Sequence, residues 1–521
     1  MKSILNKYLN KENILVITLL FIVLFPVIEL DYLAFEFLNN MGIPRFTTIV
    51  RLVVFPLLGI LLFFRFEDNK KRFITITSIY LIIFGIYFVL HCNNAINILN
   101  NGRYSGNFIF NYVDEIMYFY TLLLPLFYIM ILKNIDISEV LIKKLTLVSS
   151  CVLAIPIFIS NIFVYSMSTY GKYTIDNIFS WFTLPYNETI NHPRLYASKF
   201  FFDEANALGI ILLVILPLLY YFFLRSNNKK ERLFIGSLIV VQSLAMIILS
   251  SRIATYGAIL IPIVLLIIYF ILIILKQESF KKIFVIFTLI LTIINGSIIP
   301  FSPAYQNQKF DATNHGFIMM GEKEREEADD YREEGKKLEE FSEEWLNFYS
   351  YMFEVYSYMI GVTPPIYYTE WYPYRFDPGF WVDLIFDYHL YDRINGRQIQ
   401  QIFMNYKYDP LTIEQKSLGM GYGTFMRGSM ILEKDFKQQF YTLGYVGFVL
   451  VMCPWIIIAL YLGVKLLFGY KKGKWNLLNI LLMMIFCITL LGGYMSGHVM
   501  DEFSTSMLLA VFVATLYRRL K

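Results

Sequence analysis

The sequence predicts an all-α polytopic membrane protein with about twelve transmembrane helices and one large extracytoplasmic loop before the last three helices. Of its 521 residues, 57% are hydrophobic and only 17% are charged. This balance excludes an ordinary soluble enzyme. Apolar runs of about twenty residues, the length that a helix needs to cross the hydrocarbon core, alternate with short clusters of lysine and arginine.

Twelve apolar segments are candidate spans. They lie at roughly 14–30, 46–66, 73–91, 112–132, 145–166, 205–224, 233–250, 253–275, 283–299, 440–464, 476–495 and 499–517. The chain is thereby divided into helices 1–9 (residues 1–299), a large loop (residues 300–438) and helices 10–12 (residues 439–521). The first span has no small-residue cleavage site before Glu29, so we expect it to be retained.

Basic residues assign the two sides of the membrane. They gather at alternate ends of the spans, in clusters that include Lys2, Lys7, Lys11, Arg65, Lys70, Lys71, Arg72, Lys133, Lys143, Lys144, Arg225, Lys229, Lys230, Arg232, Lys276, Lys281, Lys282, Lys465, Lys471, Lys472, Lys474, Arg518, Arg519 and Lys521. Cytoplasmic loops carry the excess of lysine and arginine. We therefore expect both termini to be cytoplasmic and the loop at 300–438 to be external.

The large loop differs in charge from the rest of the chain. It holds 23 acidic and 14 basic residues, a net charge of −9, whereas the remainder has a net charge of +13. An acidic external unit of this kind is no partner for nucleic acid. Between Trp345 and Tyr391, eighteen of 47 residues are Trp, Tyr or Phe, a density that suits both packing at a membrane interface and stacking against sugar rings.

The sequence indicates neither a metal nor a cofactor. Its four cysteines lie in or beside apolar runs, without the spacing of a disulfide framework or a zinc site. No phosphate-binding glycine loop of the nucleotide-binding type occurs. Four of the histidines lie scattered over external segments without ligand spacing: His91, His192, His315 and His389.

Three external arginines are candidate ligands of a substrate phosphate. Arg194 lies before the sixth span, Arg252 in the turn between the seventh and eighth, and Arg397 in the large loop. An ionised group at membrane depth is costly and persists when it is paired or functional. Because the planar arginine fork makes bidentate contacts with phosphate oxygens, we expect all three to bind a lipid-linked diphosphate. A snorkelling interfacial side chain is the open alternative for Arg252.

Carboxylates and an amide accompany these arginines. Glu204 and Asn206 stand at the entrance of the sixth span, where we expect them to position the substrate, although Glu204 also suits the dipole of that helix. Glu433 and Asp435 return a carboxylate pair to the membrane surface at the end of the large loop. We expect one of them to act as the base or to orient the acceptor. Arg51, inside the second span, is expected to pair within the bundle.

The other external charges have structural interpretations. Asp114 and Glu115 are expected to mark the outer end of the fourth span. His498, Asp501 and Glu502, at the outer start of the last span, either cap that helix or join the acceptor site.

Four motifs occur in a set order along the chain. They are R…F…(D/E)xNxLG from Arg194 to Gly209, an SR turn at Ser251 and Arg252, (S/N)GR at Asn395 to Arg397, and GxGYG at Gly419 to Gly423. In this order, with many spans and one large external loop before the last few, the chain resembles the superfamily of O-antigen ligases and of O-antigen or capsular-polysaccharide polymerases. These are bacterial polytopic membrane glycosyltransferases with a GT-C-like organisation.

One departure from that family concerns the segment after the loop. Family members commonly begin it with a histidine, in the form HNxFL…(E)xGxxG. Glu433 through Gly447 fits this spacing, with Glu433 in the place of the histidine. Since the histidine is the candidate base of ligases, the departure favours a polymerase.

The resemblance implies a metal-independent, inverting transfer of a sugar chain from undecaprenyl diphosphate to a glycan hydroxyl, on the outer face of the bacterial cytoplasmic membrane. It also implies the partners: an undecaprenyl-diphosphate-linked oligosaccharide, membrane lipid, a chain-length regulator and a flippase. Two alternatives stay open. One is a ligase that moves finished polymer to a different acceptor, and the other is a flippase or transporter of the lipid-linked oligosaccharide.

Overall fold

The structure is a computed structural model that describes residues 10–65, 70–100, 108–169, 173–183, 192–313, 322–360, 365–388, 396–424 and 430–521. Within these residues the chain is helical and forms no strand, apart from two isolated β-bridges. It divides into two compact units. Unit 1 comprises Met1–Ile74, Leu122–Phe310 and Trp455–Lys521, and unit 2 comprises Thr75–Thr121 and Asp311–Pro454. The all-α membrane fold predicted from the sequence is therefore confirmed.

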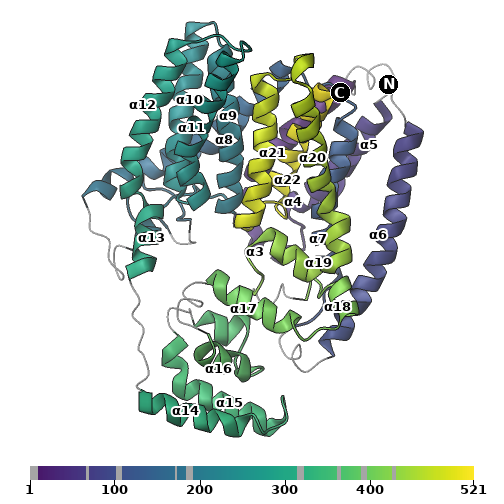
Figure 1. Cartoon of the computed structure of the whole chain (residues 1–521), viewed down its shortest axis with the longest axis vertical. Coiled ribbons are helices and arrows are strands. Elements are labelled where there is room, and N and C mark those ends of the chain that lie inside the picture. Colours follow the sequence, from purple (N-terminus) through teal and green to yellow (C-terminus); the bar gives the residue numbers. More distant parts are fainter. Residues whose placement is uncertain are drawn as a thin grey trace. The chain divides into compact units, whose positions relative to one another are not determined.

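Unit 1 is a bundle of long apolar helices (Figure 1). Its helices are α2 (Lys11–Ile28), α3 (Phe35–Asn40), α4 (Phe46–Ile49), α5 (Phe55–Arg65), α8 (Glu139–Ile162), α9 (Ala205–Arg225), α10 (Lys229–Leu249), α11 (Arg252–Ile274), α12 (Lys282–Ile298), α13 (Pro303–Thr313), α21 (Leu477–Met495) and α22 (Phe503–Leu520). The C-terminal part of α7 (Tyr112–Leu132) and most of α20 (Cys453–Phe468) also belong to it.

Helix α9 is the centre of unit 1. It is apolar around its whole circumference, the pattern expected of a helix that no solvent or lipid reaches, and all its residues except Asn206 and Arg225 are buried. It contacts α8, α10, α11, α21 and α22. Small residues allow the close approach of α11, because a Cβ on Gly257 would lie 2.1 Å from Leu213 Cδ1 and one on Gly209 would lie 2.6 Å from Ser251 Oγ.

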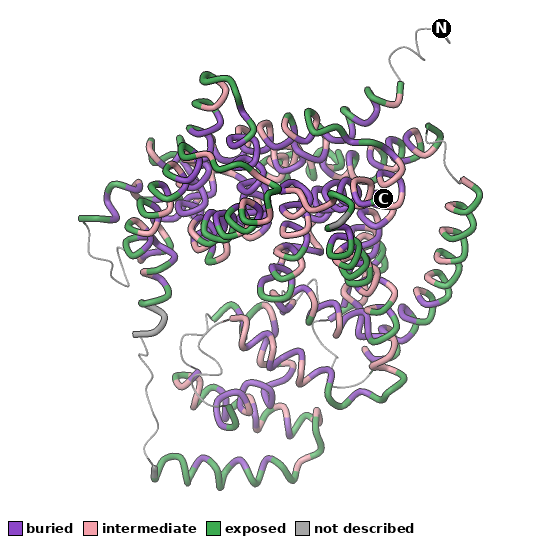
Figure 2. The backbone as a smooth tube through the Cα atoms, turned by 45° about the horizontal axis from the view of Figure 1, so that its top comes forward, coloured by how far each residue is buried: buried purple, intermediate pink, exposed green. Residues whose placement is uncertain are grey.

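Unit 2 contains most of α6 (Lys70–Leu99) and the helices that follow α13. The latter are α14 (Glu322–Gly335), α15 (Glu343–Tyr356), α16 (Pro378–Phe386), α17 (Gly396–Tyr408) and α18 (Ile413–Leu418), followed by α19 (Asp435–Val451). Helix α6 is exposed along most of its length (Figure 2). The amphipathic sequences of α15 and α17 instead direct one face of each helix into a shared core.

The aromatic stretch of the loop supplies the core of unit 2. Trp381 and Phe403 are completely buried, and Tyr372 packs between them with ring centroids 6.4 Å and 4.8 Å away. Lys407 is also buried here, and its ammonium donates to the hydroxyl of Tyr372. Composition had suggested an interfacial or sugar-stacking surface for this stretch. Many of its largest rings instead stabilise the unit by removing apolar area from water.

Two glycines from distant motifs bring their backbones into contact in unit 2. Gly444 interrupts α19 with φ 68° and ψ −176°. A Cβ on Gly444 would lie 2.4 Å from the amide nitrogen of Gly419. The residues after Gly419 form hydrogen bonds with backbone carbonyls near this kink. The Met420 amide donates to Tyr441 O at 3.1 Å, and the Gly421 amide donates to Thr442 O at 2.9 Å. Packing therefore requires glycine at position 419 of GxGYG, where a Cβ would lie 2.3 Å from Thr442 O.

Eleven helices in the described part of the chain are long and apolar enough to cross a membrane. They match eleven of the twelve segments expected from hydropathy, with the sixth to ninth reproduced within a few residues. The twelfth segment, 499–517, forms α22, which is almost wholly buried but carries Arg518 and Arg519 in its last turn. It is not among the eleven. The tenth span is longer than expected, because α19 and α20 follow one another from Asp435 to Phe468.

Replacement of Gly444 by alanine should destabilise the protein by about 2 to 4 kcal/mol, since it adds steric overlap to an unfavourable left-handed backbone. The control is Gly473→Ala, because Gly473 also has a positive φ of 69°, in the milder left-handed α region with ψ 17°, and a Cβ added to it would meet no atom within 4 Å. The control should cost about 1 to 2 kcal/mol. Thermal unfolding of the purified protein in detergent measures both. Equal losses from the two variants would show that neither the contact with Gly419 nor the unusual ψ of Gly444 adds to the cost.

Candidate functional site

The segment before α9 holds Arg194 in a defined backbone. Pro193–Tyr196 forms a short 3-10 helix, and the Oγ of Ser168 donates to Arg194 O at 2.5 Å. The Ser198 amide donates to Ile248 O at 3.0 Å, at the end of α10. The Arg194 side chain is exposed, and its Nε donates to Asn307 Oδ1 of α13 at 3.0 Å. The first predicted phosphate ligand thus stands on the surface of unit 1.

Arg252 lies in the same part of unit 1. It is the first residue of α11, after the N-cap Ser251, and its side chain is exposed. One turn later, Tyr256 donates to Gln308 Oε1 at 3.0 Å. Gln308 follows Asn307, the partner of Arg194, so consecutive residues of α13 contact Arg194 and the first turns of α11. The structure therefore brings the surroundings of Arg194 and Arg252 together.

Glu204 and Asn206 occupy the entrance of α9. Glu204 is the N-cap residue, but its side chain makes no capping hydrogen bond, and it is exposed. Asn206 is partly buried in the first turn. The Glu204 carboxylate therefore does not cap α9 by a hydrogen bond, although its negative charge interacts favourably with the dipole at the N-terminus of the helix.

Lys199 was not singled out by the sequence. Its side chain is buried, and the ammonium donates to Asp203 O at 2.6 Å. Burial lowers the pKa of Lys199, and the charges of Glu204 and Asp203 partly oppose that shift. The buried Lys199 side chain thus lies near Glu204. In the sequence, Lys199 stands between the predicted residues Arg194 and Asn206.

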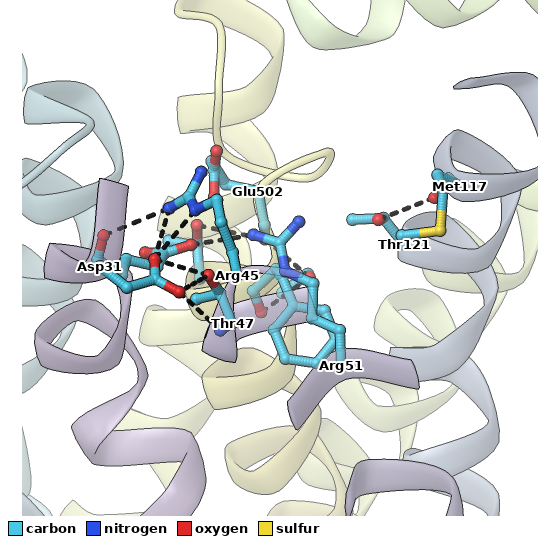
Figure 3. A network of polar contacts seen from close by, with 11 residues as sticks. Asp31, Arg45, Thr47, Arg51, Met117, Thr121 and Glu502 are labelled. Carbon is cyan, nitrogen blue, oxygen red and sulfur yellow. Dashed lines mark hydrogen bonds and ion pairs between the residues drawn. The ribbon is translucent and has the colours of Figure 1, made fainter. Parts of the chain in front are cut away.

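A second set of charges lies at the end of α2 in unit 1 (Figure 3). Asp31 accepts from Arg45 Nη2 at 2.7 Å and from the Thr47 amide at 2.8 Å, which anchors the start of α4. Arg51 Nη2 donates to Glu29 Oε1 at 2.9 Å. The expected pairing of Arg51 within the bundle is thereby confirmed.

Arg51 is also held by aromatic rings and faces further carboxylates. Its guanidinium carbon lies 5.2 Å from the ring centroids of both Phe25 and Phe503, a cation–π arrangement. Glu502, the N-cap residue of α22, lies near enough to Arg51 and Glu29 for their charges to act on it. Glu502 therefore belongs to this charged cluster, which the sequence had left open.

In unit 2 the structure brings Arg397 and Glu433 together. Arg397 Nε donates to Glu433 Oε2 at 2.9 Å, and the two side chains are 39% and 40% exposed. The Glu433 amide is held by Gln400 Oε1 at 3.2 Å. Glu433 Oε1 has no hydrogen-bond partner within the described ranges. The pair is thus accessible and has acceptor capacity left.

Neighbouring residues add positive charge to this pair. Lys434 is partly buried, and its pKa is lowered by burial and then by the charges of Lys437 and Arg397. Tyr367 also lies near Glu433, and burial together with the charge of Glu433 raises the pKa of Tyr367 to about 12. A Cβ on Gly396 would lie 2.1 Å from the Tyr367 hydroxyl, which explains the glycine before Arg397. Asn395 of the same motif lies outside the described residues.

Asp435 differs from Glu433 in exposure. It is the first residue of α19 and only 1% exposed. Acidic side chains in the first turn of a helix stabilise its dipole. Of the two predicted carboxylates, Glu433 is therefore the accessible one.

The GxGYG segment packs against a buried polar network in unit 2. His91 Nε2 lies 2.9 Å from Glu115 Oε1, with both side chains completely buried. The other oxygen of Glu115 accepts from the Gly423 amide at 2.6 Å. Asn94 donates to Gly419 O at 2.8 Å. His91 and Glu115, expected to be a loop histidine and a helix-end marker, hold this glycine segment in place.

The predicted residues fall into two groups, one in each unit. Arg194, Arg252, Glu204 and Asn206 belong to unit 1, and Arg397, Glu433 and Asp435 to unit 2. Among the described residues, no group of three or more His, Cys, Asp or Glu side chains is arranged to hold a metal ion.

The three residues of the cluster of Glu29, Arg51 and Glu502 share one signal in the sequence. In the topology expected from the sequence, Glu29 and Glu502 each lie at the outer end of an apolar run, and Arg51 lies near the outer end of another. Ionised groups at the same predicted depth of different spans are candidates for mutual pairing.

Comparison with known proteins identifies the family to which the chain belongs. The family described as "O-antigen ligase like membrane protein" matches residues 11–521. The chain belongs to this family. The match covers both units and all the candidate residues, and it supports a multi-pass membrane enzyme that acts on lipid-linked polysaccharide. Searches of curated proteins and of solved structures return no match.

Arg51→Met should lower the stability of this family member by about 2 to 4 kcal/mol, because it leaves Glu29 partly buried without its partner. The double variant Arg51→Met with Glu29→Met should recover most of the loss, since no unpaired charge remains. Thermal unfolding in detergent reports both effects. If Arg51→Met unfolds at the wild-type temperature, the pair is not what holds α2 and the following helices together.

Proposed function

We propose that the protein is a polymerase of lipid-linked polysaccharide repeat units. It transfers a growing chain from undecaprenyl diphosphate to a glycan hydroxyl, on the outer face of the bacterial cytoplasmic membrane. The accessible ion pair of Arg397 and Glu433 carries the proposal. Family membership supports the general chemistry, and the carboxylate in place of the histidine that ligases carry supports the polymerase.

The reaction is an inverting displacement. The acceptor hydroxyl oxygen attacks the anomeric carbon from the side opposite the diphosphate, and the bond from that carbon to the phosphate oxygen breaks. The bonding electron pair leaves with the diphosphate. The hydroxyl proton passes to a base, and Glu433 Oε1 is the accessible acceptor for it. Asp435 is too buried for this role.

The arginines stabilise the charge that develops on the leaving group. Arg194 and Arg252 are exposed guanidinium groups on neighbouring segments of unit 1, and Arg397 offers a further guanidinium beside Lys434. Donors aimed at developing charge are worth more than equal ground-state contacts, because they act chiefly in the transition state. Glu204 and Asn206, at the mouth of α9, position the substrate.

Alanine at Arg194, Arg252 or Arg397 should each reduce polymer formation by roughly 100-fold, the cost of losing one donor to a developing oxyanion. Glu433→Gln should cause a comparable loss, since it keeps the size but removes the base. The readout is the polymer ladder in cells that lack the native copy. Arg375→Ala is the matched control, because Arg375 is an exposed arginine of the same loop, stacked on Phe376. Full-length polymer from all three arginine variants would remove these residues from the site.

A ligase is the second candidate, favoured by the family description. The purified protein, reconstituted with lipid-linked oligosaccharide, separates these activities. We expect release of undecaprenyl diphosphate and a ladder with repeat-unit spacing on the same carrier. Transfer of the glycan to a different carrier would identify a ligase. Movement of the lipid between leaflets without diphosphate release would identify a flippase and overturn the proposed chemistry.

A further inference from the structure

A cavity of about 370 Å³ opens in unit 2, between α16 and α17. Its volume lies at the lower end of the range of small-molecule sites. Its lining combines aromatic, acidic and aliphatic side chains: Phe380, Asp383, Asp387, Tyr388, Ile402 and Tyr406. None of these residues belongs to the site described above.

An arginine from a third helix fixes the acidic side of the cavity. Arg332 of α14 is only 9% exposed, and it donates to Asp383 Oδ1 and to Asp387 Oδ1, each at 2.6 Å. The two carboxylates remain accessible, with side chains 40% and 53% exposed. Asp383 Oδ2 accepts no hydrogen bond from any described residue. The cavity therefore offers carboxylate oxygens that are held in place and still accept hydrogen bonds.

Aromatic rings form the other side. Tyr388 is 36% exposed at the end of α16, and Tyr406 is partly exposed on α17. A sugar ring has an apolar C–H face that suits an aromatic ring and hydroxyl groups that donate to carboxylates. A simple cation is a poorer match, because the charge of Arg332 already offsets one of the two carboxylates.

The cavity and the Arg397–Glu433 pair lie on opposite faces of one helix. Arg397 and Tyr406 are nine residues apart on α17, which is roughly 13 Å along the axis and about half a turn around it. The same division appears in the contacts, since Gln400 and Gln401 reach Glu433 and Tyr441, whereas Ile402 and Tyr406 line the cavity. A sugar bound in the cavity is therefore remote from the reacting hydroxyl.

We propose that this cavity is a carbohydrate subsite that binds one sugar of the polysaccharide chain, away from the bond being formed. The inference rests on the proposed function for the identity of the chain, but the binding itself is independent of catalysis. A binding subsite away from the reacting bond keeps the polysaccharide chain bound between transfers. This second contact raises the effective concentration of the chain end at the site of transfer.

The binding test uses the full-length protein in detergent and polysaccharide released by mild acid from cells that make it. Tyr388→Ala should weaken binding by about tenfold, since it removes a stacking ring, whereas Tyr388→Phe should bind like the wild type. Tyr351→Ala is the matched control, because Tyr351 is 59% exposed on α15 and lies outside the cavity. Asp383→Asn, which keeps the size, should also weaken binding. Equal binding by Tyr388→Ala and the wild type, or no binding by the wild type, overturns the subsite.

The polymer ladder separates this inference from the proposed function. Tyr388→Ala should shift the ladder toward shorter chains, while Tyr351→Ala keeps the wild-type distribution. If Arg397→Ala loses the polymer but Tyr388→Ala changes neither binding nor chain length, the subsite fails and the polymerase stands. If Arg397→Ala makes full-length polymer while Tyr388→Ala still weakens binding, the proposed site fails and the subsite stands.

Discussion

The cost of placing an ionised side chain beside hydrocarbon constrains this protein more than any other interaction. Such a group persists only when a partner or a function compensates for lost hydration. Arg51 meets this condition through Glu29 and two aromatic rings, and Asp31 through Arg45 and the Thr47 amide. Because these partners come from separate helices of unit 1, pairing also determines how α2, α4 and α22 are joined.

The position of the unit 1 candidates follows from the burial of α9. A helix that is apolar on all sides must be surrounded by other helices. The segment that leads into α9 therefore packs against the neighbours of α9. Ser168 and Ile248 bond to the backbone of that segment at Arg194 and Ser198. A rigid entrance of this kind presents Arg194 and Glu204 in defined positions, which a mobile loop would not do.

Hydropathy predicted the spans because the length and polarity of a run are local properties of the chain. Pairings are not local. Glu115 bonds to Gly423, 308 residues further on, and nothing near either residue indicates the other. The motif order drew attention to Arg397 and Glu433, but only the structure reveals that they form an ion pair. The aromatic stretch was ambiguous for a similar reason, since composition counts rings without showing whether they face solvent or one another.

Exposure distinguishes a charge pair that stabilises the fold from one that can act on a substrate. Arg51 and Glu29 have side chains 25% and 14% exposed, and separating such a pair leaves a costly unpaired charge. Arg397 and Glu433 are 39% and 40% exposed, a range in which ion pairs contribute only about 0 to 1 kcal/mol. In the proposed mechanism, Arg397 exchanges Glu433 for a phosphate oxygen at little cost, and that exchange frees the Glu433 carboxylate to accept the proton of the attacking hydroxyl.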